Sequence, residues 1–129
     1  MDGPNLERGG QLYRALGEAF LEAVGDENDL FLYVEAGDGW LDISPFKVRQ
    51  EFVEWIADLD VSDMIWNARE AESPENRWTA MEYEVADGKF SVRFKYADEL
   101  IPDAWSDTRR EAILRRRFHN KSIRYPEVP

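Results

Sequence analysis

The sequence offers few side chains of the kinds that perform catalysis or hold a metal ion. His119 is its single histidine, and cysteine is absent. The chain therefore lacks a thiolate for a zinc or iron–sulfur site, a cysteine nucleophile and a two-histidine metal site. A Ser–His–Asp triad has no supporting motif such as G-x-S-x-G. We predict no catalytic residue, no metal site and no cofactor.

Acidic side chains recur at helical spacing in the middle of the chain. Glu51, Glu54 and Asp58 would share one face of a helix, with Asp60 and Asp63 beside them. Like charges at this spacing repel one another, and a basic partner surface would offset that repulsion. An ordinary solvated face is the alternative interpretation.

The net charge of −11 is unevenly distributed along the chain. Residues 1–75 carry 18 acidic and 5 basic side chains, a net −13, whereas residues 76–129 carry a net +2. Direct binding of nucleic acid requires clustered Lys and Arg, so this balance disfavours it. It favours a basic protein partner, although an acidic surface can also serve solubility alone. The short basic run from Arg109 to Arg124 is the one exception to this balance. We expect it to pair with the acidic part of the chain, and contact with phosphate is the alternative interpretation.

The length of 129 residues predicts one domain, 1–129, with flexible or extended tails at 1–9 and 120–129. The N-terminus has no basic start followed by an apolar run, so it does not resemble a secretory signal. No stretch approaches the ~20 apolar residues of a membrane span. We therefore expect a cytoplasmic protein without membrane contact.

Hydrophobic spacing predicts five elements separated by turn residues. Recurrence every three or four positions indicates helices at residues 11–24, from Ser44-Pro45 to about residue 70, and from Ser106 or Asp107 to about residue 120. Val48, Phe52, Trp55, Ile56 and Leu59 form the apolar stripe of the middle helix, although residues 60–63 could break it and cap a new turn. Two hairpins, 30–35 with 40–44 and 78–85 with 89–96, separate these helices.

The second hairpin has the clearest pattern. Apolar and polar residues alternate on both sides of the Asp87-Gly88 turn, which fixes the register. Val85 then faces Phe90, and Glu82 faces Arg93 on the solvent side. The element order predicts an α+β fold of order α-ββ-α-ββ-α, with an antiparallel sheet and helices mainly on one face.

Several segments together resemble the YezG-like immunity (antitoxin) family of bacterial polymorphic toxin systems. They are Trp78-Thr79-Ala80-Met81, Asp87-Gly88-Lys89-Phe90, Phe94-Lys95-Tyr96-Ala97-Asp98, the helix opening at Arg109-Arg110 and the Ile123-Arg124-Tyr125-Pro126 ending. The first hairpin is short and the last helix unusually rich in arginine. The resemblance implies a non-catalytic cytoplasmic protein that binds and neutralises a toxin, often a nuclease.

We expect this partner to be basic and to meet the acidic residues named above. Trp105 joins Glu51, Glu54, Asp58, Asp60 and Asp63 as a candidate contact, because it lies beside an acidic loop and a proline. A tryptophan of the core is the alternative interpretation of Trp105. The alternative is a small enzyme or ligand-binding domain, which would require a concave pocket with convergent polar groups.

Overall fold

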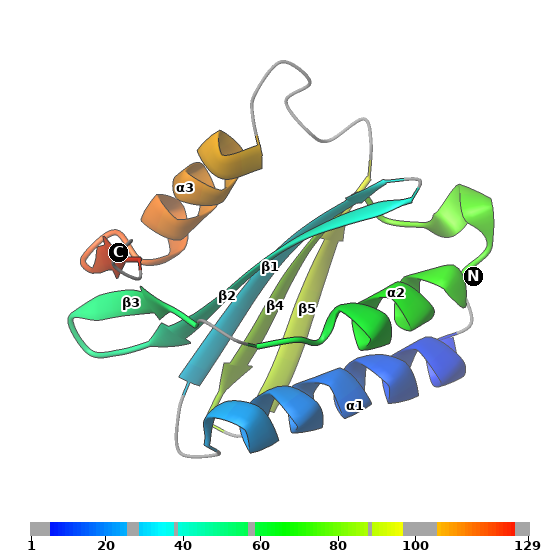
Figure 1. Cartoon of the computed structure of the whole chain (residues 1–129), viewed down its shortest axis with the longest axis horizontal. Helices are drawn as coiled ribbons and strands as arrows, with labels where there is room; N and C mark the ends of the chain where they lie inside the picture. Colours follow the sequence, from blue (N-terminus) through cyan, green and yellow to red (C-terminus); the bar gives the residue numbers. More distant parts are fainter. Residues whose placement is uncertain are drawn as a thin grey trace.

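The computed structural model describes residues 6–25, 29–37, 39–56, 59–87, 89–96 and 106–125. Within them, three α-helices, six strands and a short 3-10 helix follow one another along the chain (Figure 1). In order they are α1 (Leu6–Val24), β1 (Asp29–Gly37), β2 (Trp40–Val48), β3 (Phe52–Trp55), α2 (Ser62–Glu70), η1 (Pro74–Asn76), β4 (Ala80–Ala86), β5 (Lys89–Lys95), α3 (Ser106–Arg117) and β6 (Ser122–Arg124).

The strands form one mixed sheet in the order β5-β4-β1-β2-β3-β6. All neighbouring strands are antiparallel except β3 and β6, which run parallel. The α+β class is confirmed, and the sheet is mostly antiparallel. β1 and β4 lie side by side and join the two hairpins into a single sheet through the pairs from Leu30 with Val85 to Glu35 with Ala80.

The hairpin of β4 and β5 has the predicted register. Val85 lies opposite Phe90, and Glu82 opposite Arg93. Asp87 has a φ of 53°, a left-handed conformation that Asp tolerates better than most residues and that a two-residue hairpin turn requires. The expected solvent exposure of Glu82 is wrong, because α3 covers that face and leaves Glu82 only 3% exposed.

The predicted helix from Ser44 to about residue 70 is wrong for its first part. Residues 40–48 form β2 and residues 52–55 form β3, joined by a tight turn in which the Arg49 amide donates to the Phe52 carbonyl. Val48, Phe52 and Trp55 have the spacing of a helix stripe but are β-branched or aromatic residues that also suit strands. Pairing of β2 with β1 and of β3 with β2 decides for strands. The break foreseen at residues 60–63 is confirmed, since α2 begins at Ser62.

The sheet is covered on both faces, so the helices are not all on one side (Figure 1). On one face α1 and α2 pack against Leu30, Leu32 and Val34 of β1. On the opposite face α3 packs against alternate residues of the same strand, Phe31 and Tyr33. Because β1 is buried on both faces, its sequence is a nearly continuous apolar run.

Helix α1 approaches the sheet closely and ends at the predicted glycine. Gly17 faces Tyr83 and Phe90, and a Cβ added there would lie 2.8 Å from a Phe90 ring atom. Gly25 has a φ of 99°, and its amide donates to the Leu21 carbonyl, as expected for a glycine that ends a helix. Helix α1 extends back to Leu6, into the residues expected to form a tail.

Part of the expected C-terminal tail, residues 120–129, is paired with the sheet. Helix α3 begins at Ser106 as predicted, and the chain then turns back so that residues 122–124 pair in parallel with β3. Lys121 fixes this return by donating from Nζ to the carbonyls of Arg49 at 2.6 Å and Gln50 at 2.7 Å. The turn between β2 and β3 is thereby tied to the C-terminal segment.

Candidate functional site

The predicted contact residues fall into two groups in the structure. Glu51 is exposed in the turn between β2 and β3, and Glu54 lies in β3, where its Oε2 is 3.6 Å from Arg49 Nε. Asp60 and Asp63 are exposed at the start of α2. Asp58 and Trp105 lie outside the described residues. Because the segment before residue 57 is not helical, the predicted carboxylates do not form one helix face.

The second group lies at the start of α2, whose packing against α1 the sequence pattern did not indicate. Helices α1 and α2 pack against each other in antiparallel orientation, so the start of α2 lies toward the C-terminal half of α1 (Figure 1). That half carries exposed Glu18 and Glu22. We call Glu18, Glu22, Asp60 and Asp63 the acidic end.

The acidic end has local features that keep its charge available. Asp60 Oδ1 accepts hydrogen bonds from the backbone amide of Ser62 at 3.1 Å and from its hydroxyl at 2.6 Å, and these bonds lower the Asp60 pKa. A surface hollow of about 450 Å³ lies beside Glu18, Leu21, Glu22 and Gly25. Among the described residues, Glu18, Glu22 and Asp63 form no ion pair.

On the face of the sheet that α3 covers, two buried glutamates form ion pairs with arginines of α3. We call Glu35, Glu82, Arg109, Arg116 and Arg117 the charged seam. Glu82 accepts from Arg117 at 3.1 Å and Arg116 at 3.2 Å, and Lys95 of β5 lies 3.7 Å away. The three arginines are spaced at i, i+7 and i+8, which places them on one face of the helix. Two signals in the sequence could have indicated these ion pairs. They are the spacing of the three arginines and the position of Glu35 within the apolar run of β1.

Glu35 is the more deeply buried carboxylate of the charged seam, at 1% exposure. Arg109 approaches it with two nitrogens, and the Tyr33 hydroxyl donates to its Oε2. The Glu35 carboxylate raises the pKa of Arg109. Burial, followed by the hydrogen bond to Glu35, raises the pKa of Tyr33. These groups hold α3 on the sheet.

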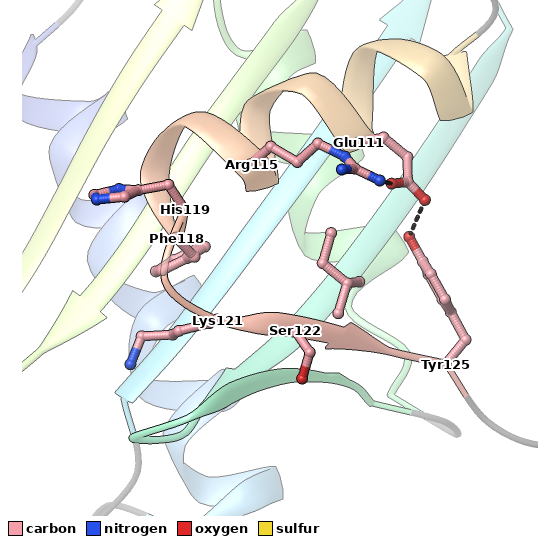
Figure 2. Close-up of a pocket in the computed structure, with 8 residues that line it drawn as sticks. Glu111, Arg115, Phe118, His119, Lys121, Ser122 and Tyr125 are labelled. Carbon is pink, nitrogen blue, oxygen red and sulfur yellow. Dashed lines mark hydrogen bonds and ion pairs between the residues drawn. The ribbon is translucent and has the colours of Figure 1, made fainter.

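A pocket of about 420 Å³ lies between α3 and β6 (Figure 2). Phe118 and Ile123 supply its apolar lining, and Arg115, His119, Lys121 and Tyr125 supply polar groups. These groups do not converge. Arg115 and Tyr125 turn to Glu111, with distances of 3.5 Å and 3.2 Å, whereas His119 and Lys121 point away from that end of the pocket (Figure 2).

A cluster of rings adjoins this pocket and contains a cation. The guanidinium of Arg110 lies over the rings of Trp55, at 5.7 Å, and Tyr125, at 5.2 Å. Phe46 packs edge-on against Trp55 at a centroid separation of 5.4 Å. This arrangement fixes the start of α3 to β2 and β3 through cation–π contacts. Arg110 is therefore engaged within the fold.

Among the described helices, none is long and apolar enough to cross a membrane. Within the same residues, no group of three or more His, Asp or Glu side chains is placed to hold a metal ion. The sequence matches no model of a known protein family, and no curated protein matches it.

Proposed function

We propose that this chain is a non-catalytic binding protein that neutralises a basic protein toxin, with the acidic end as its main contact surface. The similarity of residues 78–126 to YezG-like immunity proteins supports this function. A nuclease that grips phosphate requires a basic active site, and an acidic surface can occlude such a site. The mechanism is therefore steric and electrostatic blocking.

The observation that carries the proposal is that charged side chains are ion-paired on one face of the sheet and unpaired, within the described residues, on the other. Arg109, Arg116 and Arg117 of α3 form ion pairs with the buried carboxylates of Glu35 and Glu82, which offsets their positive charge. The carboxylates of the acidic end, by contrast, face solvent without ion pairs within the described residues. A protein of net charge −11 thus directs negative potential outward at this end.

The remaining predicted contacts take a secondary place in the proposal. Glu54 is paired with Arg49 and stands opposite Arg124 in the parallel pairing of β3 with β6, so its charge is partly offset. Glu51 lies in the same turn region. These two residues serve as a matched comparison for the acidic end. Asp58 and Trp105 stay as predicted contacts.

The pocket between α3 and β6 favours a second candidate, a domain that binds a small ligand. Its volume of about 420 Å³ falls within the range of small-molecule sites. The separation of its polar groups in Figure 2 argues for the protein-binding function first. A ligand screen by thermal shift tests the alternative.

The direct test of the proposed function is a pull-down with the tagged protein from its source cells. We expect one basic protein to be retained at about 50 mM salt and weakened at about 500 mM, because salt screens charge-driven association. The variant E18K/E22K/D63K should lose this protein, and E51K/E54K should retain more of it. Retention of the same partner by all three proteins would contradict the placement at the acidic end.

A further inference from the structure

Strand β5 is the long open edge of the sheet. It is the terminal strand beyond β4, and the strand at the other edge, β6, has only three residues. Ser91, Val92 and Arg93 at its middle are exposed. No other strand pairs with β5 in the described part of the chain. An open edge of this kind presents backbone amides and carbonyls that can receive an additional strand.

The edge carries a row of positive charge on one face. Lys89, Arg93 and Lys95 occupy alternate positions of β5, with Ser91 between them, and therefore project on the same side of the sheet. Lys95 contributes to the ion pairs around Glu82. Arg93 lies directly opposite Glu82, whose oxygens are already engaged by Arg116 and Arg117. Within the described residues, Lys89 and Arg93 have no ion-pair partner.

The charges on this edge distinguish between its possible occupants. Antiparallel pairing of two β5 strands centred on Val92 would place Lys89 opposite Lys95 twice, and like charges at opposed positions are destabilising. A second copy of the chain is thus disfavoured. A strand with carboxylates at alternate positions would instead bring opposite charges together across the edge.

The other face of β5 offers apolar contacts for such a strand. Val92 is 39% exposed, and it lies between Phe90 and Phe94, which pack against the core beneath α1. A peptide residue that alternates with the carboxylates would rest beside Val92. The two faces of β5 therefore favour a peptide in which acidic and apolar side chains alternate.

We propose that β5 binds an extended acidic peptide segment by strand addition. The peptide backbone pairs with the open edge, and its carboxylates meet Lys89 and Arg93. A repeat of two residues, about 6.6–6.8 Å, matches the spacing of side chains on the strand. The open strand edge favours a peptide over nucleic acid, because only a polypeptide backbone supplies a matching row of N–H donors and C=O acceptors. This site is separate from the acidic end and does not depend on toxin binding.

The test uses the full chain and a synthetic heptapeptide in which Glu and Val alternate. We expect its addition to shift backbone amide NMR signals of β5, whereas a peptide of the same composition without alternation should bind at least fivefold more weakly. The variant K89E/R93E should weaken binding by at least fivefold. The control R115E, at a side chain that is 76% exposed on α3, should change binding less than twofold.

Three outcomes would overturn the proposal. They are absence of shifts in β5 at millimolar peptide, equal binding of both peptides, and equal binding by K89E/R93E. Tighter binding of a ten-nucleotide oligothymidylate at β5 would reject the peptide as the occupant. Dimerisation of the unmodified protein through β5, seen by sedimentation and lost in V92E, would reject it in favour of a second copy.

Discussion

Arg109 of α3 and Glu35 of β1, which are 74 positions apart, form a two-pronged ion pair, with Nε at 2.6 Å from Oε2 and Nη2 at 2.7 Å from Oε1. The carboxylate is 1% exposed and also accepts a hydrogen bond from Tyr33. A buried carboxylate requires this degree of compensation, because its removal from water is costly. Arg109 thus fixes the position of α3 along β1.

Replacing Arg109 with Lys should destabilise the fold. Lysine keeps the charge but cannot reproduce two parallel hydrogen bonds to one carboxylate. We expect a loss of about 2 kcal/mol in the free energy of unfolding, measured by urea denaturation. Arg115→Lys provides the matched control, since the Arg115 side chain is 76% exposed and its pair with Glu111 lies on the surface. A similar loss in both variants would contradict a special role of the buried pair.

Glu82 should matter far more than its neighbour Glu84. The Glu82 side chain is 2% exposed and faces Lys95, Arg116 and Arg117. Glu82→Gln leaves these cations without their shared counter-charge, and we expect a loss of about 3 kcal/mol. Glu84 is 32% exposed and meets Arg117 alone, so Glu84→Gln should cost under about 1 kcal/mol. Chemical denaturation of both variants measures the difference, and equal losses would contradict this ranking.

Glu72 gives the fold a specific pH dependence. Burial raises its pKa above the ordinary value of 4.5, and its Oε2 has no hydrogen-bond partner. The folded state therefore holds the Glu72 proton more tightly than the unfolded state, and stability falls as pH rises from 4.5 to the raised pKa. Above the raised pKa of Glu72, the full free-energy cost of burying its charged carboxylate lowers the stability of the folded state.

Glu72→Gln should accordingly stabilise the protein at pH 7 by about 1 kcal/mol, with the gain fading near pH 4. Urea denaturation at the two pH values measures this effect. Glu75→Gln, at an exposed position in η1, serves as the control and should show no such gain. A Glu72→Gln protein that is less stable at pH 7 would show that attraction from Arg69 and Arg77 outweighs burial.

Gly17 should resist substitution, although alanine favours helices. A Cβ at Gly17 would press on the Tyr83 hydroxyl and lie 2.8 Å from Phe90, so Gly17→Ala should lower the thermal midpoint by several degrees. Tyr83→Phe removes the hydroxyl, and the double variant should recover part of the loss. Simple additivity of the two substitutions would contradict this contact.

The strength of the local signal explains which parts of the fold could be predicted. In β4 and β5, strict alternation and a two-residue turn determine the strands and their register together, without help from distant residues. In residues 44–59, Val48, Phe52 and Trp55 suit a helix stripe as well as two short strands. Pairing of β2 with β1 and of β3 with β2 and β6 decides between them, and pairing between distant segments cannot be read from local spacing.

The same limit applies to the charged residues. The exposure of Asp60 and Asp63, at the start of α2, was predictable, but the packing of α2 against α1, which carries Glu18 and Glu22, could not be read from the sequence. Glu82 has the spacing of a solvent-facing strand residue, and only the docking of α3 buries it. The basic run was expected to pair with the acidic residues 1–75. Arg109 does so through Glu35, whereas Arg116 and Arg117 pair with Glu82, which lies outside that part of the chain.

The acidic end is tested most directly by the kinetics of association with the protein captured in the pull-down. We expect the association rate constant of the unmodified chain to fall at least tenfold between about 50 and 500 mM salt. For E18K/E22K/D63K it should already be low at 50 mM salt and depend little on salt, while E51K/E54K should stay within about threefold of the unmodified chain. Identical rates and salt dependence for the unmodified chain and E18K/E22K/D63K would contradict the proposed contact surface.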